Sequence, residues 1–170
     1  RVTQKICTID ERKAQAMSHG GNHQGFIAQI KDVELTSFNE IKKGSFLVVL
    51  DEVTDVGNIG AIVRSAYAFG ADGLILSGVK TCNLEAILRT SSAAAFELPI
   101  AVCASTKDMM NELKQIGFCL YGADMNGVDV KEVTFAPKRV LIMGSEGKGL
   151  SPKVKEKLDK VVSIKMARAF

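Results

Sequence analysis

From Phe46 onward, the chain alternates short, almost uninterrupted apolar runs with segments of helical pattern. Such runs are typical of strands buried on both faces, as in a parallel sheet covered by helices. The runs that we interpret as strands are Phe46–Leu50, Leu74–Leu76, Ile100–Val102, Phe118–Tyr121, Val140–Met143 and Val161–Ile164. The alternation therefore predicts an α/β domain with a mostly parallel sheet flanked by helices and mostly right-handed crossovers.

The predicted helices between these runs have start and stop signals. Asn58 can cap a helix over residues 59–69, and Gly70 can end it in the left-handed conformation. Proline at a first helical position lacks only a donor that the helix would not use, so a Ser-Pro pair is a further start signal. A second helix is predicted over residues 106–116, capped by Ser105 and closed by Gly117. A third is predicted to start at Ser151-Pro152.

Residues 1–43 break this rhythm. They contain the stretch SHGGNHQG and one short apolar stretch, Phe26–Ile30. The segment is too short to bury a core of its own, so we interpret it as a linker and the remnant of another domain. The main domain is predicted to cover residues 44–170.

Composition and spacing exclude several classes of protein. No apolar run is long enough to span a bilayer and no leader-like segment opens the sequence, so we expect a cytoplasmic protein. The four cysteines form no CxxC pair, which favours reduced thiols. His19 and His23 have metal-like spacing, but Gly20 and Gly21 lie between them, so we predict no metal site. The net charge of +3 permits an RNA partner without indicating one.

Two segments have compositions that packing alone does not require. The first is Leu50–Gly73 (LDEVTDVGNIGAIVRSAYAFGADG), in which polar residues follow the first predicted strand and Arg64 lies inside the next helix. A loop at the carboxyl end of a strand is where open α/β sheets place ligands. On pattern alone, a surface arginine with a buried stem is the commoner interpretation of Arg64.

The second segment is Val140–Ser151 (VLIMGSEGKGLS), a strand that runs into a glycine-rich loop. Glycines there let the backbone approach a ligand or adopt a positive φ. The loop is not a phosphate-binding P-loop, because Ile142 stands where the first glycine is required and Gly149 follows Lys148. No GxGxxG follows the first strand, so a dinucleotide-binding fold is disfavoured. A tight turn before a helix is the alternative.

Three motifs, taken in order, resemble those of a known family. They are Asn58-x-Gly60-x3-Arg64 with Ala68-Phe69-Gly70, then Gly144-Ser145-Glu146-Gly147-x-Gly149-Leu150, and Val162-Ser163-Ile164-Lys165-Met166. Together they resemble the SpoU (TrmH) family of S-adenosylmethionine-dependent RNA 2′-O-ribose methyltransferases, within the SPOUT superfamily. His23-Gln24-Gly25 also resembles an HQG element found just upstream of the catalytic domain in the ribosomal-RNA branch.

The resemblance implies a SPOUT-type fold with an α/β knot. The family's S-L-N-x-S segment and final helix would follow Phe170, so we expect the knot to be incomplete in this chain. Residues 1–43 would correspond to the end of an N-terminal RNA-binding domain and its linker. Lys165 stands where the family usually has proline, which is expected to loosen the third loop slightly.

The resemblance also implies the site residues. The implied catalytic residues are Asn58, Arg64 and Glu146; the S-adenosylmethionine pocket would use Met143, Gly144, Gly147, Ile164 and Met166; and RNA would contact Arg64, Lys148 and His23. An arginine side chain stays protonated at neutral pH and is therefore a poor general base. We therefore expect Arg64 to grip the target phosphate and stabilise the developing alkoxide.

Several alternatives follow from the same resemblance. The HQG element favours ribosomal RNA, with guanosine as the favoured nucleotide, over a transfer-RNA substrate. A non-catalytic RNA-binding relative is the alternative from another class, and the joint presence of Asn58, Arg64 and Glu146 counts against it. The resemblance further implies a homodimer with the motif loops near its two-fold interface, and no metal or membrane partner.

Overall fold

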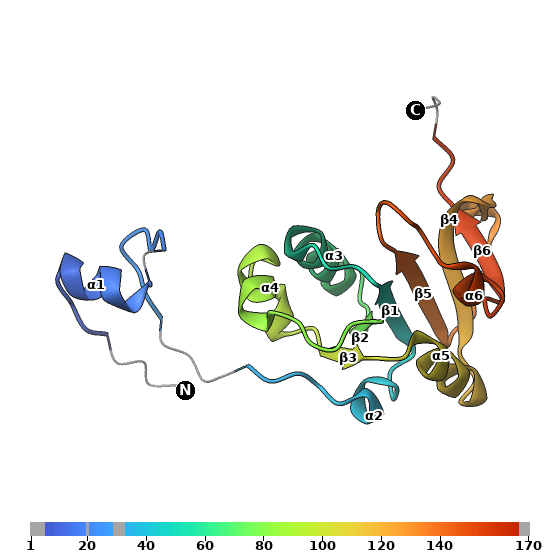
Figure 1. The fold of residues 1–170 in the computed structure, drawn as a ribbon, viewed down its shortest axis with the longest axis horizontal. Coiled ribbons are helices and arrows are strands. Elements are labelled where there is room, and N and C mark those ends of the chain that lie inside the picture. Colours follow the sequence, from blue (N-terminus) through green and yellow to red (C-terminus); the bar gives the residue numbers. More distant parts are fainter. Residues whose placement is uncertain (1–5, 20, 29–32, 167–170) are drawn as a thin grey trace. The chain divides into compact units, whose positions relative to one another are not determined.

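The computed structural model describes residues 6–19, 21–28 and 33–166 (Figure 1). It divides into two compact units, Arg1–Asp32 and Val33–Phe170. The smaller unit contains helix α1 (Glu11–Met17). Asp10 caps this helix by accepting a hydrogen bond from the Lys13 amide at 2.8 Å.

The larger unit is built on a parallel sheet whose described strands lie in the order β3-β2-β1-β5-β4-β6. The strands are β1 (Phe46–Asp51), β2 (Gly73–Ser77), β3 (Ile100–Cys103), β4 (Cys119–Asp129), β5 (Arg139–Gly144) and β6 (Lys160–Ser163). The predicted fold class is confirmed. From β1 the chain steps outward through β2 to β3 on one side, whereas β5 lies on the other side of β1. Such a switch point is where open α/β sheets form a ligand crevice.

Helices cover both faces of this sheet (Figure 1). They are α2 (Phe38–Ile41), α3 (Val56–Ala68), α4 (Leu84–Thr90), α5 (Thr106–Gln115) and α6 (Pro152–Lys155), with short 3₁₀ turns η1 (Ala94–Phe96) and η2 (Val130–Glu132). Alternate residues of β1 point to opposite faces. Leu47 and Val49 join the core under α5, and Val48 and Leu50 join the core under α3 and α4. Burial on both faces explains the continuous apolar runs.

Helix α3 begins three residues earlier than predicted. Its N-cap is Asp55, whose carboxylate accepts a hydrogen bond from the Asn58 amide at 2.7 Å. The prediction that Asn58 caps the helix was therefore wrong, and its side chain is available for another contact. The remaining helix signals are confirmed: Ser105 and Ser151 are N-caps, and Gly70 and Gly117 have φ of +73° and +89°.

Helix α4, the segment before residue 44 and the short turns η1 and η2 were not predicted. Helix α4 is capped by Asn83, and it packs so closely on α3 that a Cβ at Gly60 would lie 2.5 Å from Thr90 Cβ. The larger unit also begins at Val33 rather than at residue 44. The Thr36 amide donates to the Ile100 carbonyl at 2.7 Å, and Ile41 is buried in the core. Packing of this short segment on the sheet therefore extends the unit.

Asp72 ties the start of β1 to the start of β2. Its Oδ2 accepts hydrogen bonds from the Ser45 amide (2.7 Å), the Ser45 hydroxyl (3.0 Å) and the Phe46 amide (2.8 Å). Burial raises the pKa of this carboxyl, but the hydrogen bonds, with the nearby charge of Arg139, outweigh burial and hold its pKa below the ordinary value. The ionised form of Asp72 therefore stabilises the fold.

Replacing Asp72 with asparagine is expected to lower the free energy of unfolding at neutral pH by about 1 kcal/mol, because hydrogen bonds to a charged acceptor are lost at a partly solvated site. A depressed pKa gives stability that is present above the unfolded-state pKa of about 3.9 and lost as pH falls through the folded-state value. The melting-temperature gap to wild type should thus close below about pH 4. Glu132→Gln, at an exposed carboxylate, is the control. A gap that persists unchanged at low pH contradicts this role.

Candidate functional site

A cavity of about 390 Å³ opens beyond the carboxyl ends of β1 and β5. The loops that follow these two neighbouring strands leave the same edge of the sheet (Figure 1). The lining residues are Glu52, Val53, Thr54, Asp55, Asn58, Ala61, Ile62, Gly144, Ser145 and Glu146. The cavity therefore lies at the switch point and joins the two segments that the sequence singled out.

The loop after β1 is anchored by a buried polar chain. Asp51, only 5% exposed, accepts a hydrogen bond from the Thr106 hydroxyl at 2.6 Å, and Ser77 donates to the same hydroxyl oxygen. Burial raises the pKa of Asp51, and the bond from Thr106 opposes this shift. Glu52, with φ of +55°, turns the chain out of the strand while its amide donates to the Ser77 carbonyl at 2.9 Å. One cavity wall is thus held by β2 and α5.

Asn58 and Glu146 connect the two segments directly. Asn58 Nδ2 donates a hydrogen bond to Glu146 Oε1 at 2.8 Å across 88 positions of sequence. Asn58 is half-buried and Glu146 is exposed. Among the described residues, Asn58 Oδ1 and Glu146 Oε2 have no hydrogen-bond partner, so both oxygens can accept hydrogen bonds from a ligand in the cavity.

The glycine-rich loop after β5 is closed on itself. The Gly149 amide donates to the Ser145 carbonyl at 2.8 Å, and Gly149 has φ of +61°. A Cβ at Gly144 would lie 2.2 Å from the backbone carbon of Gly149. By contrast, a Cβ at Gly147 would meet nothing within 4 Å. Gly144 is therefore required by the backbone of the loop itself, whereas the open space at Gly147 is compatible with a bound ligand.

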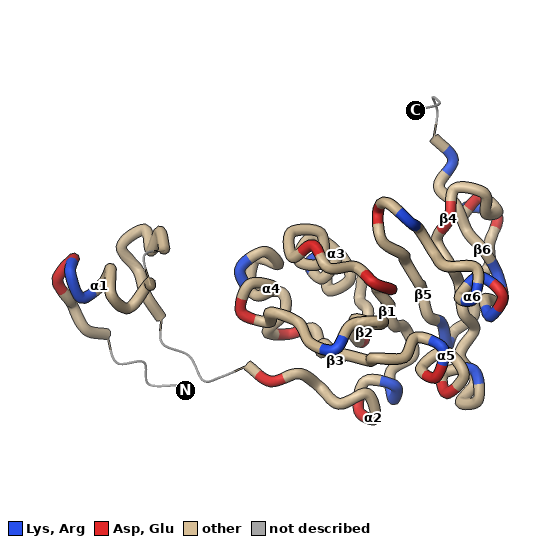
Figure 2. Tube along the Cα trace, in the orientation of Figure 1, with Lys and Arg blue, Asp and Glu red and all other residues tan. Residues whose placement is uncertain are grey.

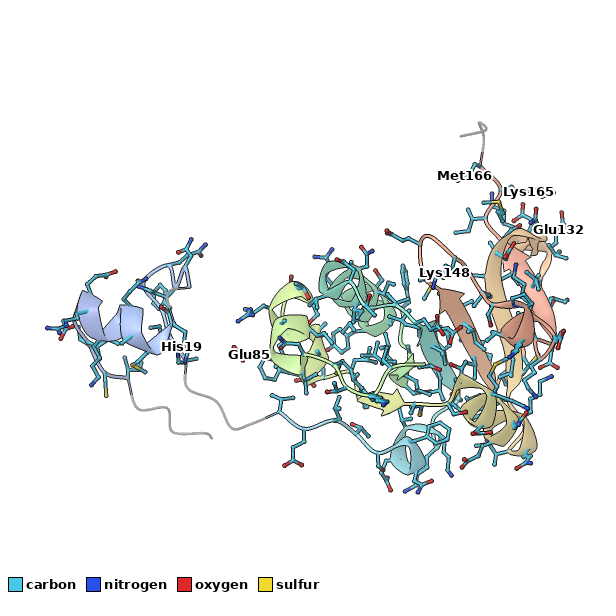
Figure 3. All side chains as sticks on the ribbon, in the orientation of Figure 1. His19, Glu85, Glu132, Lys148, Lys165 and Met166 are labelled. Carbon is cyan, nitrogen blue, oxygen red and sulfur yellow. The ribbon has the colours of Figure 1, made fainter. Side chains whose placement is uncertain are left out.

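The residues predicted to bind the cofactor lie at two places. Gly144 lines the cavity, and Met143 packs against the core under α3 and α4. Ile164 (77% exposed) and Met166 (63% exposed) follow β6, which is separated from β5 by β4. Figure 3 shows Met166 beyond the end of β6. The larger unit therefore presents two exposed apolar side chains directly after β6, on the side of β4 away from β5.

Arg64 is not brought to Asn58 and Glu146. Six residues of α3 correspond to roughly 240° around a helix, so Asn58 and Arg64 point in different directions. Arg64 instead lines a second hollow of about 430 Å³. The other lining residues of this hollow are Tyr67, Ala68, Ser91, Ser92, Ala93, Ala94, Phe96 and Glu97. Among the described residues, no carboxylate pairs with Arg64. Its guanidinium is exposed and available to an anion.

His23 belongs to the smaller unit. Its Nδ1 accepts a hydrogen bond from the Gly25 amide at 3.1 Å, and its Nε2 lies 3.5 Å from Glu11 Oε1. Within the described residues, no group of three or more His, Cys, Asp or Glu side chains is arranged to hold a metal ion. A helix of the length and apolarity that a membrane crossing requires is also absent from the described part of the chain.

Sequence reasoning missed the anchoring role of Asp51, Ser77 and Thr106. Asp51 and Ser77 each directly follow a predicted strand, and these polar residues at the ends of apolar runs were the signal that the sequence offered. The register then places them at matched positions of neighbouring parallel strands. Thr106 was interpreted only as the first residue of a helix. Its hydroxyl lies 55 positions from Asp51 in sequence, so only the packing of α5 on the sheet brings the two together.

Residues 45–170 match the model of the SpoU rRNA Methylase family. A protein of Archaeoglobus fulgidus named an uncharacterized tRNA/rRNA methyltransferase is 34% identical over 94% of this chain and 75% of its own length. A protein of Mycolicibacterium gilvum with the same name is 31% identical over 95% of this chain and 54% of its own. The chain thus spans about half the length of some relatives.

Solved structures agree with these matches. The SpoU methyltransferase AviRb of Streptomyces viridochromogenes, in complex with AdoMet, is 32% identical, with a TM-score of 0.72 over 81% of this chain and 58% of its own. An AdoMet-bound rRNA methyltransferase of Sinorhizobium meliloti is 27% identical, with a TM-score of 0.69 over 79% of this chain and 53% of its own. The motifs, the fold and the family match agree, and the chain belongs to the SpoU rRNA methylase family.

Proposed function

We propose that the full-length protein transfers a methyl group from S-adenosylmethionine to a ribose 2′-hydroxyl in RNA. The observation that carries this proposal is the hydrogen bond between Asn58 and Glu146, which joins two family motifs at the rim of one cavity. The names of the relatives support an RNA substrate of the tRNA or rRNA class. The HQG element favours ribosomal RNA, with guanosine as the target nucleotide, and such a substrate fits a cytoplasmic protein.

The cofactor is proposed to lie against the loop after β5 and the segment after β6. Two solved relatives hold AdoMet. The residues fit this ligand, because Gly144 lets the loop close, the open space at Gly147 leaves room for a ligand, and Met143, Ile164 and Met166 supply apolar side chains. S-adenosylmethionine would supply an electrophilic methyl group there. The cavity beside Asn58 would then receive the acceptor ribose from the other side of the loop.

The side chains at the cavity are proposed to orient the acceptor. Glu146 holds the amide of Asn58, which leaves Asn58 Oδ1 to accept a hydrogen bond from a ribose hydroxyl. Alignment of the hydroxyl with the methyl donor supplies much of the rate enhancement in an in-line displacement. Arg64 would grip the neighbouring phosphate and stabilise the alkoxide that develops as the hydroxyl proton passes to water.

A homodimer is proposed to complete the site. Within one chain, Arg64 lies outside the cavity, beside the half-exposed aromatic rings of Tyr67 and Phe96. A surface with exposed aromatic side chains and an unpaired guanidinium has the composition of a protein interface. A two-fold axis near α3 would bring Arg64 to the cavity of the partner subunit. The α/β knot is proposed for the intact protein together with this dimer.

The proposal is tested with full-length protein, S-adenosylmethionine labelled on the methyl group, and purified ribosomal and transfer RNA. We expect label in ribosomal RNA, at one position that resists alkaline cleavage because its 2′-hydroxyl is blocked. Label confined to transfer RNA would establish the alternative substrate. Label on a base would overturn the assignment. So would a protein that binds RNA but neither transfers methyl groups nor shows a heat of S-adenosylmethionine binding in calorimetry.

A further inference from the structure

A row of exposed lysines follows the strands at the carboxyl edge of the sheet. Every described strand except β1 is followed by one of them. In the order of the strands across the sheet, these edge lysines are Lys107 after β3, Lys80 after β2, Lys148 after β5, Lys131 after β4 and Lys165 after β6. Figure 3 shows Lys148 beside the arrowhead of β5 and Lys165 beyond the end of β6. In Figure 2, blue segments occur in the loop after β5 and in the segment after β6.

The edge lysines have no partner within the described part of the fold. None of their ammonium groups is in an ion pair or a side-chain hydrogen bond there. Lysines elsewhere are commonly engaged: Lys42 with Glu112, Lys114 with Asp159, Lys155 with Asp124 and Lys138 with the Ile116 carbonyl. Internal packing therefore does not explain the row of charges at this edge.

Lys107 is placed where a positive charge is unfavourable. It lies in the first turn of α5, where the helix dipole disfavours a positive charge by about 0.3–1 kcal/mol. Asp108 and Glu132 neighbour edge lysines in sequence, but neither forms an ion pair with them. A cation at an unfavourable position, without a partner in the described fold, suits contact with an external anion.

The row is interrupted only at the cavity. After β1 come Glu52 and Asp55 in place of a lysine, and these residues line the cavity. Two edge lysines lie on one side of this point and three on the other. Strands about 4.8 Å apart give the edge a width of roughly 24 Å. A chain of phosphates crossing it would meet positive charge on both sides of the proposed ribose position.

We propose that a single strand of RNA runs along this edge, with its phosphates against the edge lysines and the target ribose over the cavity. Lysine ammonium groups act as point charges that follow a backbone without reading its sequence. This proposal rests on the proposed function. It assigns the RNA path to Lys80, Lys107 and Lys131, which lie outside the family motifs, and to Lys148 and Lys165, which lie within them.

The test measures binding of a fluorescent single-stranded RNA to the full-length protein at several salt concentrations. Each phosphate contact to single-stranded RNA contributes about 0.7 to the slope of log Kobs against log salt. The double variants Lys80→Ala/Lys107→Ala and Lys148→Ala/Lys165→Ala are each expected to reduce this slope by about 1.4. The charge-matched control is Lys153→Ala/Lys160→Ala, at exposed lysines in α6 and at the start of β6, whose slope should stay at the wild-type value.

The outcomes separate this proposal from the proposed function. Equal losses of slope in both double variants and in the control would show a general charge effect and overturn the RNA path. An unchanged slope in either double variant would overturn a continuous row across the edge. If wild type binds RNA with the expected slopes but transfers no methyl group, the proposed function fails while the path stands. If wild type transfers methyl groups normally but the double variants keep the wild-type slope, the proposed function stands and the RNA path fails.

Discussion

Replacing Arg64 with alanine in the full-length enzyme is expected to lower methyl transfer to RNA by a factor on the order of 100 or more, the effect of losing one preorganised charge-stabilising donor. The guanidinium is exposed and no carboxylate pairs with it in the described part of the chain. Affinity for S-adenosylmethionine should hardly change, because Arg64 lies outside the loop that is proposed to hold the cofactor. Single-turnover transfer of labelled methyl groups measures the rate, and calorimetry measures cofactor binding.

Two controls make the Arg64 result interpretable. Arg64→Lys should be nearly as harmful, since an ammonium group cannot reproduce the bidentate fork of the guanidinium. The melting temperature of both variants should stay close to wild type, because an exposed side chain contributes little to stability. If Arg64 only covers surface, either variant would retain a rate within about twofold of wild type, and the catalytic assignment would be abandoned.

The dimer predicts complementation between two inactive variants. If Arg64 serves the cavity of the partner subunit, a mixed dimer of Arg64→Ala and Glu146→Ala has one intact site and one doubly damaged site. Equal mixing with free exchange of subunits should restore roughly a quarter of wild-type activity. Full-length protein that light scattering shows to be monomeric would contradict the proposed dimer. A mixture as inactive as its components would contradict the placement of Arg64 in the partner's cavity.

Replacing Gly144 with alanine is expected to damage both the fold and cofactor binding. The new Cβ would lie 2.2 Å from Gly149 C and O and 2.6 Å from Leu150 N, all of them backbone atoms that cannot move without opening the loop. We expect the free energy of unfolding to fall by about 1–3 kcal/mol, as for other overpacked sites. Affinity for S-adenosylmethionine should fall at least about tenfold, the equivalent of only 1.4 kcal/mol.

Gly147→Ala is the matched control for this loop. Its Cβ would meet nothing within 4 Å, so the melting temperature should hardly change. A loss of cofactor affinity at an unchanged melting temperature would place the ligand next to Gly147. If Gly144→Ala melts and binds S-adenosylmethionine like wild type, the closed loop is not the cofactor-binding conformation.

The sequence by itself determined the elements of the sheet and the two segments that form the cavity. The six runs from Phe46 onward that were interpreted as strands became strands, because a strand that is buried on both faces needs apolar residues at most positions, and that requirement is local. The glycines at 70 and 117 and the serines at 105 and 151 also act locally, as caps. The predicted start of α3 was wrong, since Asp55 and Asn58 are both residue types that cap helices, and packing of the helix decides between them.

The tertiary structure decided which of these segments meet. Nothing local to Asn58 specifies a contact with Glu146, because placing β5 beside β1 depends on the packing of the whole chain. Nothing local specifies the contact of Thr106 with Asp51 either. The separation of Arg64 from the cavity depends on the direction in which Arg64 points from α3, which the packing of that helix decides. Pairing of distant strands and burial of helix faces are long-range free energies, and a single sequence motif carries no record of them.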